Sequence, residues 1–343
     1  MRVTSLAFWI LGTDLLAESL LLGSKKRDNN EKEHMSRQYR VWRDHLASCI
    51  NDAMPLEESY VLLHTANLVG LFTCVFIKQK ERQRVRNISS AEVKRGMGGL
   101  HGNKVGLSIL VLSLASHIYK GALILRFVLD DSSLCFINCH LAAGQTQTAN
   151  RNNDIAAILE SESLPAENSL TARTDLFVNG GDGTMILDHE ICIVNGDLNY
   201  RIDSMPRHVV IEAVRQNNLP KLLDRDQLLA SKRKNPSFRL RSFNEAPITF
   251  APTYKYDVGS DDYDSSEKKR SPAWCDRVLY RGVGRVKQTE YRRHEVRASD
   301  HRPVSASFKM RIKTISPKER AATWEVCQKE FAKEKKRVAC DTR

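Results

Sequence analysis

A short apolar strand that ends abruptly in a polar loop constrains the fold of this chain more than any other stretch. Residues 191–194 (Ile-Cys-Ile-Val) form a buried, mostly β-branched run, which predicts a strand. Residues 195–201 (Asn-Gly-Asp-Leu-Asn-Tyr-Arg) follow at once. In α/β proteins, ligands and metals bind where the carboxyl ends of buried strands meet solvent. Asn-Gly-Asp is also ordinary turn chemistry, so this stretch alone leaves a ligand site and a simple turn open.

The length and charge of the chain indicate what it binds. With 343 residues, 41% hydrophobic and 27% charged, the chain is globular and long enough for one large domain or two ordinary ones. Its formal net charge of +12 indicates an anionic partner, and nucleic acid, a phosphorylated small molecule and an acidic membrane surface all remain open. The cysteines are scattered without a Cys-x-x-Cys pair, which favours reduced thiols in the cytosol over disulfides or a zinc site.

The amino-terminal part predicts a strand and a helix. Residues 1–34 form an atypical segment whose apolar run resembles a weak signal peptide, but a buried strand followed by a loop explains it better. Acidic residues interrupt this run, and no transmembrane helix fits there. Residues 35–53 predict an amphipathic helix with Trp42, Leu46 and Ile50 on one side.

Two strands and a glycine-rich loop follow. Residues 60–77 predict neighbouring strands separated by a turn at Ala66-Asn67. Residues 96–104 are rich in glycine and end in Lys, which suits phosphate binding, although the spacing is not that of a Walker A loop. Residues 105–120 are mostly apolar and are too short to span a bilayer.

Polar residues recur where other predicted strands end. Hydrolysis of a phosphate ester needs oxygen ligands for a hard cation, a base for water, and cationic donors for the phosphoryl oxygens. The strand ends together supply each of these. Their side chains are Asn138, His140, Asp197, Asn199, Asp276, Asp300 and His301.

Several motifs resemble those of one family. The inositol polyphosphate 5-phosphatases, of the magnesium-dependent endonuclease/exonuclease/phosphatase superfamily, carry similar blocks in the same order. The matching residues are 138–143, 195–202, 252–257, 272–277 (Pro-Ala-Trp-Cys-Asp-Arg) and 299–304 (Ser-Asp-His-Arg-Pro-Val). The resemblance covers residues 60–312 and implies an α/β fold: a four-layer α/β sandwich of the endonuclease/exonuclease/phosphatase type, here lacking its first strands.

The resemblance also implies roles for the strand-end residues. Asp197 would be the base that activates water, and Asn199 would position the attacking group. His301 would contact the scissile phosphate as an imidazolium oriented by Asp276, and His140 would be a second phosphate ligand.

Further residues match the family's metal and substrate contacts. Asp300 would lie near the Mg²⁺ ion. Contacts with the 4-phosphate beside the scissile group match Tyr254, Lys255, Lys268 and Arg270, and a substrate-facing loop contains Asn103 and Lys104.

Two departures from the family pattern stand out. The family's strand with a Gln-Glu pair, whose carboxylate is the principal metal ligand, has no match before Met35. Residues 105–120 interrupt a block that is continuous in the family, so we interpret them as an insertion. We hypothesise that both departures are gene-model errors, a wrong start and a retained intron. The catalytic domain would span residues 35–312, and residues 313–343 predict a charged helix that begins at Ser316-Pro317.

The expected function is Mg²⁺-dependent hydrolysis of the 5-phosphate of phosphatidylinositol 4,5-bisphosphate, related phosphoinositides or inositol polyphosphates. A catalytically impaired domain that binds phosphoinositides or acts as a scaffold is the alternative. The matches at Tyr254, Lys255, Lys268 and Arg270 argue against a nuclease, so no nucleic-acid partner is expected. The basic surface predicts a cytoplasmic protein attached at the periphery of membranes. The oligomeric state stays open.

Overall fold

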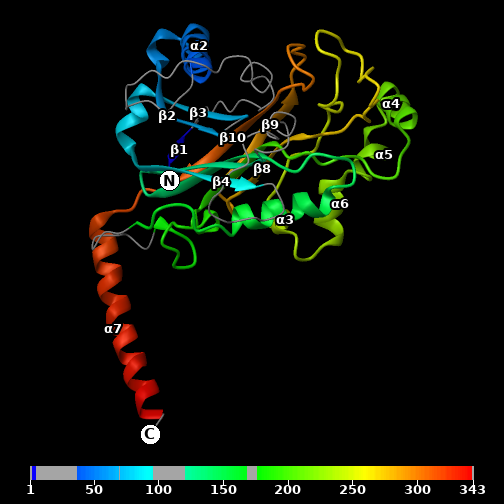
Figure 1. Ribbon diagram of the computed structural model, residues 1–343. Coiled ribbons are helices and arrows are strands. Elements are labelled where there is room, and N and C mark those ends of the chain that lie inside the picture. The colour runs from blue at the N-terminus through cyan, green and yellow to red at the C-terminus, as the bar shows by residue number, and fades with distance from the viewer. Residues whose placement is uncertain (1, 5–36, 69, 96–119, 168–175, 342–343) are drawn as a thin grey trace, which may run out of the picture.

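The computed structural model describes residues 2–4, 37–68, 70–95, 120–167 and 176–341 of the chain (Figure 1). Its strands form a central sheet and two smaller sheets. Helix α2 lies beside one of the small sheets, and α3 and α6 lie on the opposite side of the central sheet.

The central sheet carries the strand ends that the sequence singles out. Its order is β4 (Val85–Arg95), β5 (Lys120–Leu129), β6 (Ser132–His140), β7 (Ile191–Asp197) and β8 (Asp276–Arg281). The β6 and β7 strands are parallel, and the other neighbours are antiparallel. Parallel neighbours need a long crossover, which here contains α3 (Thr148–Leu159). The predicted strand at 191–194 is therefore confirmed, and β6 and β7 end at the same edge of the sheet.

The smaller sheets contain hairpins. One sheet pairs β2 (Tyr60–Leu68) with β3 (Leu71–Lys78), and the other has the order β1 (Arg2–Thr4), β10 (Val304–Ile312), β9 (Val286–Arg293). The strand β1 belongs to the segment 1–34, and the rest of that segment up to residue 34 lies outside the described residues.

The predicted turn at Ala66-Asn67 is wrong. Both residues pair with β3 inside the ladder, and the chain reverses at Gly70 instead. Gly70 has φ +81°, and its missing Cβ would meet nothing within 4 Å. A glycine adopts this left-handed backbone readily, which makes it the better turn residue.

Six helices accompany these sheets in the described residues. The predicted helix at 35–53 is confirmed as α2 (Arg37–Ala53), and its Trp42, Leu46 and Ile50 pack against Phe72, Cys74 and Phe76 of β3. The other helices are α3, α4 (Arg207–Arg215), α5 (Leu219–Leu223), α6 (Gln227–Lys234) and α7 (Pro317–Asp341).

Alternating side chains build the layers. On β5, Leu125 and Phe127 face a core shared with both small sheets, whereas Ala122 and Ile124 face a second core shared with α3 and the loops around it. This alternation is the two-residue period of a strand buried on both faces. A third core lies between α2 and the small sheet of β2 and β3. The layers are, in order, the helix α2, the small sheets, the central sheet, and the helices α3 and α6. The predicted four-layer α/β sandwich is therefore confirmed.

The last helix extends away from the sheets (Figure 1). As predicted, α7 begins after Ser316, whose hydroxyl accepts the Glu319 amide at 3.4 Å. Trp324 and Phe331 on α7 are 56% and 72% exposed. In the part of the chain that the structure describes, no helix combines the length and the apolar character needed to cross a membrane.

Candidate active site at one edge of the central sheet

Three predicted site residues form a row at one edge of the central sheet. His140 ends β6, Asp197 ends β7, and Asp276 begins β8. The strand registers pair His140 with Asp197 and Asp197 with Asp276. Paired residues on neighbouring strands point to the same face and lie about 5 Å apart. The sheet therefore presents these three side chains side by side, at the end of the core between the sheets.

The carboxylate of Asp197 is held by Asn199. Asp197 is only 2% exposed. Its Oδ1 accepts the backbone amide of Asn199 and its Oδ2 accepts the Asn199 side-chain amide, both at 2.9 Å. The His140 Nε2 atom lies 3.6 Å from Asp197 Oδ2. The pattern is an Asx turn, so the turn and the ligand-site interpretations of this sequence are compatible.

Two backbone positions make this turn possible. Asn199 has φ +55°, in the left-handed region that Asn tolerates better than most residues. Gly196 has φ +114°, and a Cβ there would lie 2.3 Å from the backbone oxygen of Cys139. Only glycine fits at this point between β6 and β7.

The imidazole of His301 is oriented by Asp276. The Nδ1 atom of His301 lies 2.8 Å from Asp276 Oδ2, which also accepts the hydroxyl of Thr253 at 2.7 Å. The structure therefore brings His301 to the same strand end as Asp197, although the two residues lie far apart in the sequence. The Asp276 carboxylate therefore fixes the orientation of the His301 ring through Nδ1.

A buried arginine joins the two halves of this site. Arg201 is 6% exposed, and its Nε donates to the backbone oxygen of Asn199 at 3.1 Å. Its Nη2 also donates to Asn199 Oδ1. The Arg201 guanidinium carbon lies 4.3 Å from the ring centroid of Tyr254, and that ring lies 4.6 Å from the ring of His301. Burial acts to lower the pKa of Arg201, but nearby Cys275, Tyr254 and Asp197 raise it above its usual value.

Arg201 lies inside the motif at 195–202, but the sequence predicted no role for it. The signal that could have found it was its place two residues after Asn199, at the end of a buried loop. Its second partner, Tyr254, is distant in the sequence and 6% exposed. The predicted contact of Tyr254 with the 4-phosphate stays a prediction.

Asp300, predicted near the metal, binds a lysine. The carboxylate of Asp300 forms an ion pair with the ammonium group of Lys255. Burial acts to lower the pKa of Lys255, but the hydrogen bond and charge of Asp300 raise it above its usual value. Lys255 therefore stays cationic, as a phosphate contact requires.

Lys268 and Arg270 lie on an exposed loop that begins after Lys255. Asp264, 1% exposed, ties this loop down, because its amide donates to the Lys255 oxygen at 2.9 Å and its carboxylate accepts the Arg270 amide at 2.7 Å. Hydrogen bonds to the Asp264 carboxylate hold its pKa below its usual value although burial acts to raise it. No role for Asp264 was predicted from the sequence.

The other two predicted substrate contacts, Asn103 and Lys104, lie outside the described residues, as does the predicted insertion up to residue 119. Lys120, counted with that insertion, is the first residue of β5 and pairs with Arg95.

The described side chains supply part of a cation site without completing it. The side-chain oxygens Asn138 Oδ1 and Asn195 Oδ1 are buried beneath the row with no hydrogen-bond partner, and such oxygens suit a hard cation. Each carboxylate of the site, however, already binds a protein group. Across the described ranges, no cluster of three or more His, Cys, Asp or Glu side chains is arranged to hold a metal ion.

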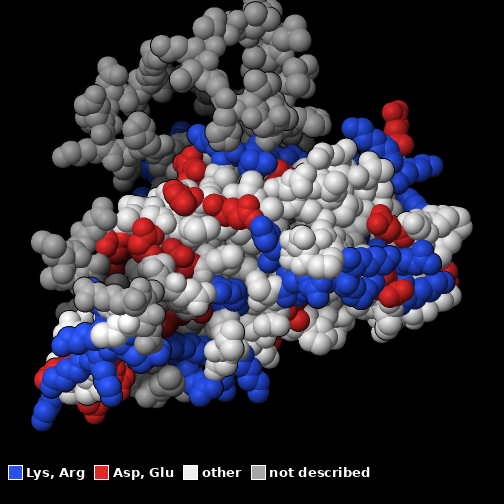
Figure 2. Space-filling model, turned by 90° about the horizontal axis from the view of Figure 1, so that it is seen from below, with Lys and Arg blue, Asp and Glu red and all other residues white. Residues whose placement is uncertain are grey.

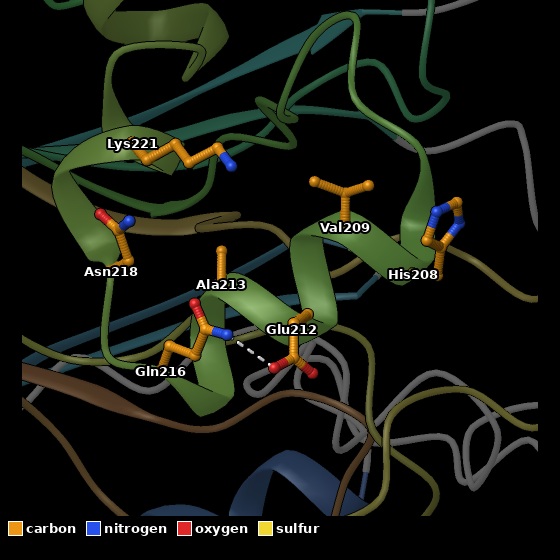
Figure 3. Close-up of a pocket in the computed structure, with 7 residues that line it drawn as sticks. All are labelled: His208, Val209, Glu212, Ala213, Gln216, Asn218 and Lys221. Carbon is orange, nitrogen blue, oxygen red and sulfur yellow. Dashed lines mark hydrogen bonds between the residues drawn. The ribbon is translucent and has the colours of Figure 1, made fainter.

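A separate cavity of about 180 Å³ lies between α4 and α5 (Figure 3). None of the predicted site residues lines it. Its lining consists of His208, Val209, Glu212, Ala213, Gln216, Asn218 and Lys221. We therefore take the sheet edge as the candidate active site.

The chain is similar to known phosphatases. The family model described as endonuclease/exonuclease/phosphatase family 2 matches residues 16–307. A "probable inositol polyphosphate 5-phosphatase" of Schizosaccharomyces pombe is 46% identical over 330 residues, which are 95% of this chain and 26% of that protein. The "phosphatidylinositol 4,5-bisphosphate 5-phosphatase A" of Mus musculus is 34% identical over 266 residues, which are 73% of this chain and 23% of that protein.

A solved structure resembles the fold as a whole. It is the inositol polyphosphate 5-phosphatase domain of SPsynaptojanin in complex with inositol (1,4)-bisphosphate and calcium ion. The TM-score is 0.67 at 30% sequence identity, and the match covers 88% of this chain and 77% of that chain. The present chain spans about a quarter of the length of the two curated relatives.

Proposed function

Because the chain belongs to endonuclease/exonuclease/phosphatase family 2 and, within it, to the inositol polyphosphate 5-phosphatases, we propose that it removes the 5-phosphate from phosphorylated inositols. The proposed substrates are phosphatidylinositol 4,5-bisphosphate, related phosphoinositides and soluble inositol polyphosphates. The name of the mouse relative supports the lipid substrate. The inositol (1,4)-bisphosphate in the solved relative supports the headgroup, since it is what remains when a 1,4,5-trisphosphate loses its 5-phosphate.

One observation carries this proposal. A buried carboxylate with an adjacent carboxamide, Asp197 with Asn199, lies at the same strand ends as an imidazole bound to a carboxylate, His301 with Asp276. Phosphate-ester hydrolysis requires a base for water on one side and a cation for the phosphoryl oxygens on the other.

The proposed reaction assigns one task to each side chain. Asp197 accepts a proton from water as the water oxygen forms a bond to phosphorus. The bond between phosphorus and the inositol 5-oxygen breaks, that oxygen takes up a proton from solvent to become a hydroxyl, and Asp197 returns its proton to solvent. His301, held as an imidazolium by Asp276, binds a phosphoryl oxygen and stabilises the charge that develops there. His140 provides a second contact to the phosphate.

The neighbouring 4-phosphate needs its own cations. We assign this contact to Lys255, Lys268 and Arg270, with Tyr254 beside them. The Lys255 ammonium carries its positive charge next to Asp300, and Lys268 and Arg270 lie exposed on the loop that Asp264 anchors. Charge-assisted hydrogen bonds from these groups would select a bisphosphorylated ring.

We also propose Mg²⁺ as the metal of this reaction. The calcium ion in the solved relative supports a hard divalent cation, as do the two buried carboxamide oxygens of Asn138 and Asn195. Since the described residues do not complete a ligand set, the proposed steps stand without it. Chelation by EDTA is expected to abolish phosphate release, and added Mg²⁺ is expected to restore it.

The proposed setting is the cytoplasmic face of an acidic membrane. Figure 2 shows Lys and Arg side chains in several groups on the face that it presents. Helix α6 ends in Lys232, Arg233 and Lys234, and the chain carries a net charge of +12. Basic side chains near an anionic surface each contribute about 1 kcal/mol of attraction, so several of them together favour peripheral attachment.

A binding module without catalysis is the second candidate. The incomplete cation site among the described residues favours it. Such a domain would hold a phosphoinositide headgroup at the same cationic side chains and release no phosphate.

Phosphate release separates the two candidates. We would measure Mg²⁺-dependent release from vesicles with phosphatidylinositol 4,5-bisphosphate and from soluble inositol 1,4,5-trisphosphate. Asp197→Asn is expected to lower kcat at least ~100-fold by loss of the base. Asp224→Asn, a surface carboxylate that pairs with Arg233, is the matched control. Headgroup binding without release from either substrate would reject the enzyme and favour the binding module.

A further inference from the structure

We propose that Arg201 is a positioning residue that fixes the base and the phosphate-binding imidazole of this site relative to each other. The inference rests on the proposed function, since it assigns Asp197 and His301 their tasks. No role for Arg201 was predicted from the sequence.

On one side, Arg201 binds Asn199, which in turn binds the proposed base Asp197. The two hydrogen bonds from its guanidinium end on the backbone oxygen and on the side-chain oxygen of Asn199. The amide nitrogen of that same side chain donates to Asp197 at 2.9 Å. The carboxamide of Asn199 has one oxygen and one nitrogen, so Arg201 on the oxygen and the Leu141 backbone oxygen, which accepts from the nitrogen at 3.2 Å, together turn the nitrogen toward Asp197.

On the other side, Arg201 supports the imidazole. Its guanidinium lies over the Tyr254 ring, and the same ring contacts the ring of His301. The backbones of Tyr254 and His301 also form an antiparallel bridge. A planar cation on an aromatic face is a favourable contact, worth more when both groups are buried, as here.

The contacts form a closed chain. Arg201 leads through Asn199 to Asp197, which pairs with Asp276 across the β7–β8 ladder. Asp276 binds His301, and His301 leads back through Tyr254 to Arg201. Arg201 therefore contacts both halves of the site, through Asn199 on one side and through Tyr254 on the other.

The Arg201 backbone is fixed from outside this chain of contacts. Its amide donates to the side-chain oxygen of Gln227 at 2.9 Å, and Gln227 is 1% exposed at the start of α6. The backbone that carries the guanidinium is therefore anchored to a buried residue of α6. A lysine would keep the charge but would lose the fork that binds two oxygens and the plane that stacks.

The test compares Arg201→Lys and Arg201→Met with Arg126→Lys. Arg126 is also a buried arginine, 5% exposed, and it donates to the backbone oxygens of Gly183 and Pro165 away from the site. Both Arg201 variants are expected to lower kcat ~10- to 100-fold with KM nearly unchanged, because a misplaced base slows chemistry more than binding. Arg126→Lys is expected to leave kcat unchanged.

A double-variant cycle tests whether Arg201 acts through Asn199. In the Asn199→Ala background, Arg201→Lys is expected to lower kcat by a smaller factor than in wild type, because residues in one network are not additive and, of the two side-chain links, only the one through Tyr254 remains. Equal losses of kcat in the two backgrounds would overturn the proposal, as would a loss that appears in KM alone.

A spectroscopic measurement keeps the proposal independent of activity. We expect the NMR signals of the His301 imidazole to move in Arg201→Lys and to stay in place in Arg126→Lys. If wild type releases no phosphate but these signals move, the proposed function fails and the positioning role stands. If wild type is active and the signals do not move, the positioning role fails alone.

Discussion

Asp276 lies directly opposite Asp197 in the antiparallel β7–β8 pair, and the two carboxylates bind different groups. Asp197 accepts from the two amide groups of Asn199, whereas Asp276 accepts from the His301 ring and from Thr253. The separate partners allow the two carboxylates to do different work.

Removal of the charge on Asp276 tests the imidazolium. Asp276→Asn keeps the shape of the side chain but no longer balances a positive His301. We expect kcat for phosphate release to fall ~100-fold, within the range seen when a general acid or base loses its function. Asp224→Asn is the control, and a steady-state assay is the measurement. A kcat equal to that of the control would show that His301 works uncharged.

The exposed cations on the Asp264-anchored loop should determine preference for a second phosphate. Lys268→Ala and Arg270→Ala are each expected to raise KM ~10-fold for a 4,5-bisphosphorylated substrate, because each loses a charge-assisted hydrogen bond. KM for a substrate that carries only the 5-phosphate should not change. Lys309→Ala, an exposed lysine on β10, controls for general charge. Equal KM changes on both substrates would argue against a 4-phosphate contact.

Gly196 should tolerate no side chain. In Gly196→Ala the new Cβ would meet the Cys139 oxygen at 2.3 Å, and φ is +114°. We expect the free energy of unfolding to fall by about 3 kcal/mol or more and kcat to fall with it. Gly259→Ala is the matched control, because Gly259 has φ +80° and nothing within 4 Å of its Cβ position. It should cost only the ~1–2 kcal/mol of a left-handed residue. Equal losses of stability in chemical denaturation would contradict this prediction.

His189 should make the fold sensitive to mild acid. Burial lowers the pKa of His189 from its usual 6.5 to about 4. Between pH 6.5 and pH 4, His189 therefore binds a proton in the unfolded chain but not in the folded chain. The contribution of neutral His189 to the free energy of unfolding is fully present above pH 6.5 and is lost as the pH drops toward 4. Between pH 7 and pH 5 the loss is about 2 kcal/mol.

The neutral variant His189→Gln isolates this effect. Its loss of stability between pH 7 and pH 5, measured by chemical denaturation, should be smaller than that of wild type by the same ~2 kcal/mol. The variant loses the contact between the rings of His189 and Phe177, whose centroids are 5.4 Å apart. It will therefore be less stable than wild type at both pH values. Parallel pH curves for the two proteins would contradict the prediction.

Local sequence patterns predicted much of the fold. The run at 191–194 lies in β7, and the amphipathic segment at 35–53 forms α2, because hydrophobic periodicity reflects burial directly. The polar residues at the ends of β6 and β7 meet because parallel strands place their carboxyl ends together. Resemblance to a family supplied the assignment of roles, which the spacing of these residues could not.

Contacts between distant loops could not be predicted in this way. The Lys255–Asp300 ion pair and the stacking of Arg201 on Tyr254 depend on how long segments fold back onto the sheet. No local pattern encodes them. The turn at Gly70 was missed because Ala66-Asn67 looked like a turn by composition, while the pairing of both residues with β3 decided the outcome.

The register of the central sheet determines where this chain can change length. A single residue inserted or deleted in β7 before Ile193 would turn Asp197 from the inter-sheet face to the α3 face and reverse the buried sides of Ile193 and Val194 at the same time. Segments between strands carry no such constraint, since added residues there shift no side chain from one face to the other. Relatives of this protein should therefore differ in size between their strands while each strand of the catalytic row keeps its count of residues.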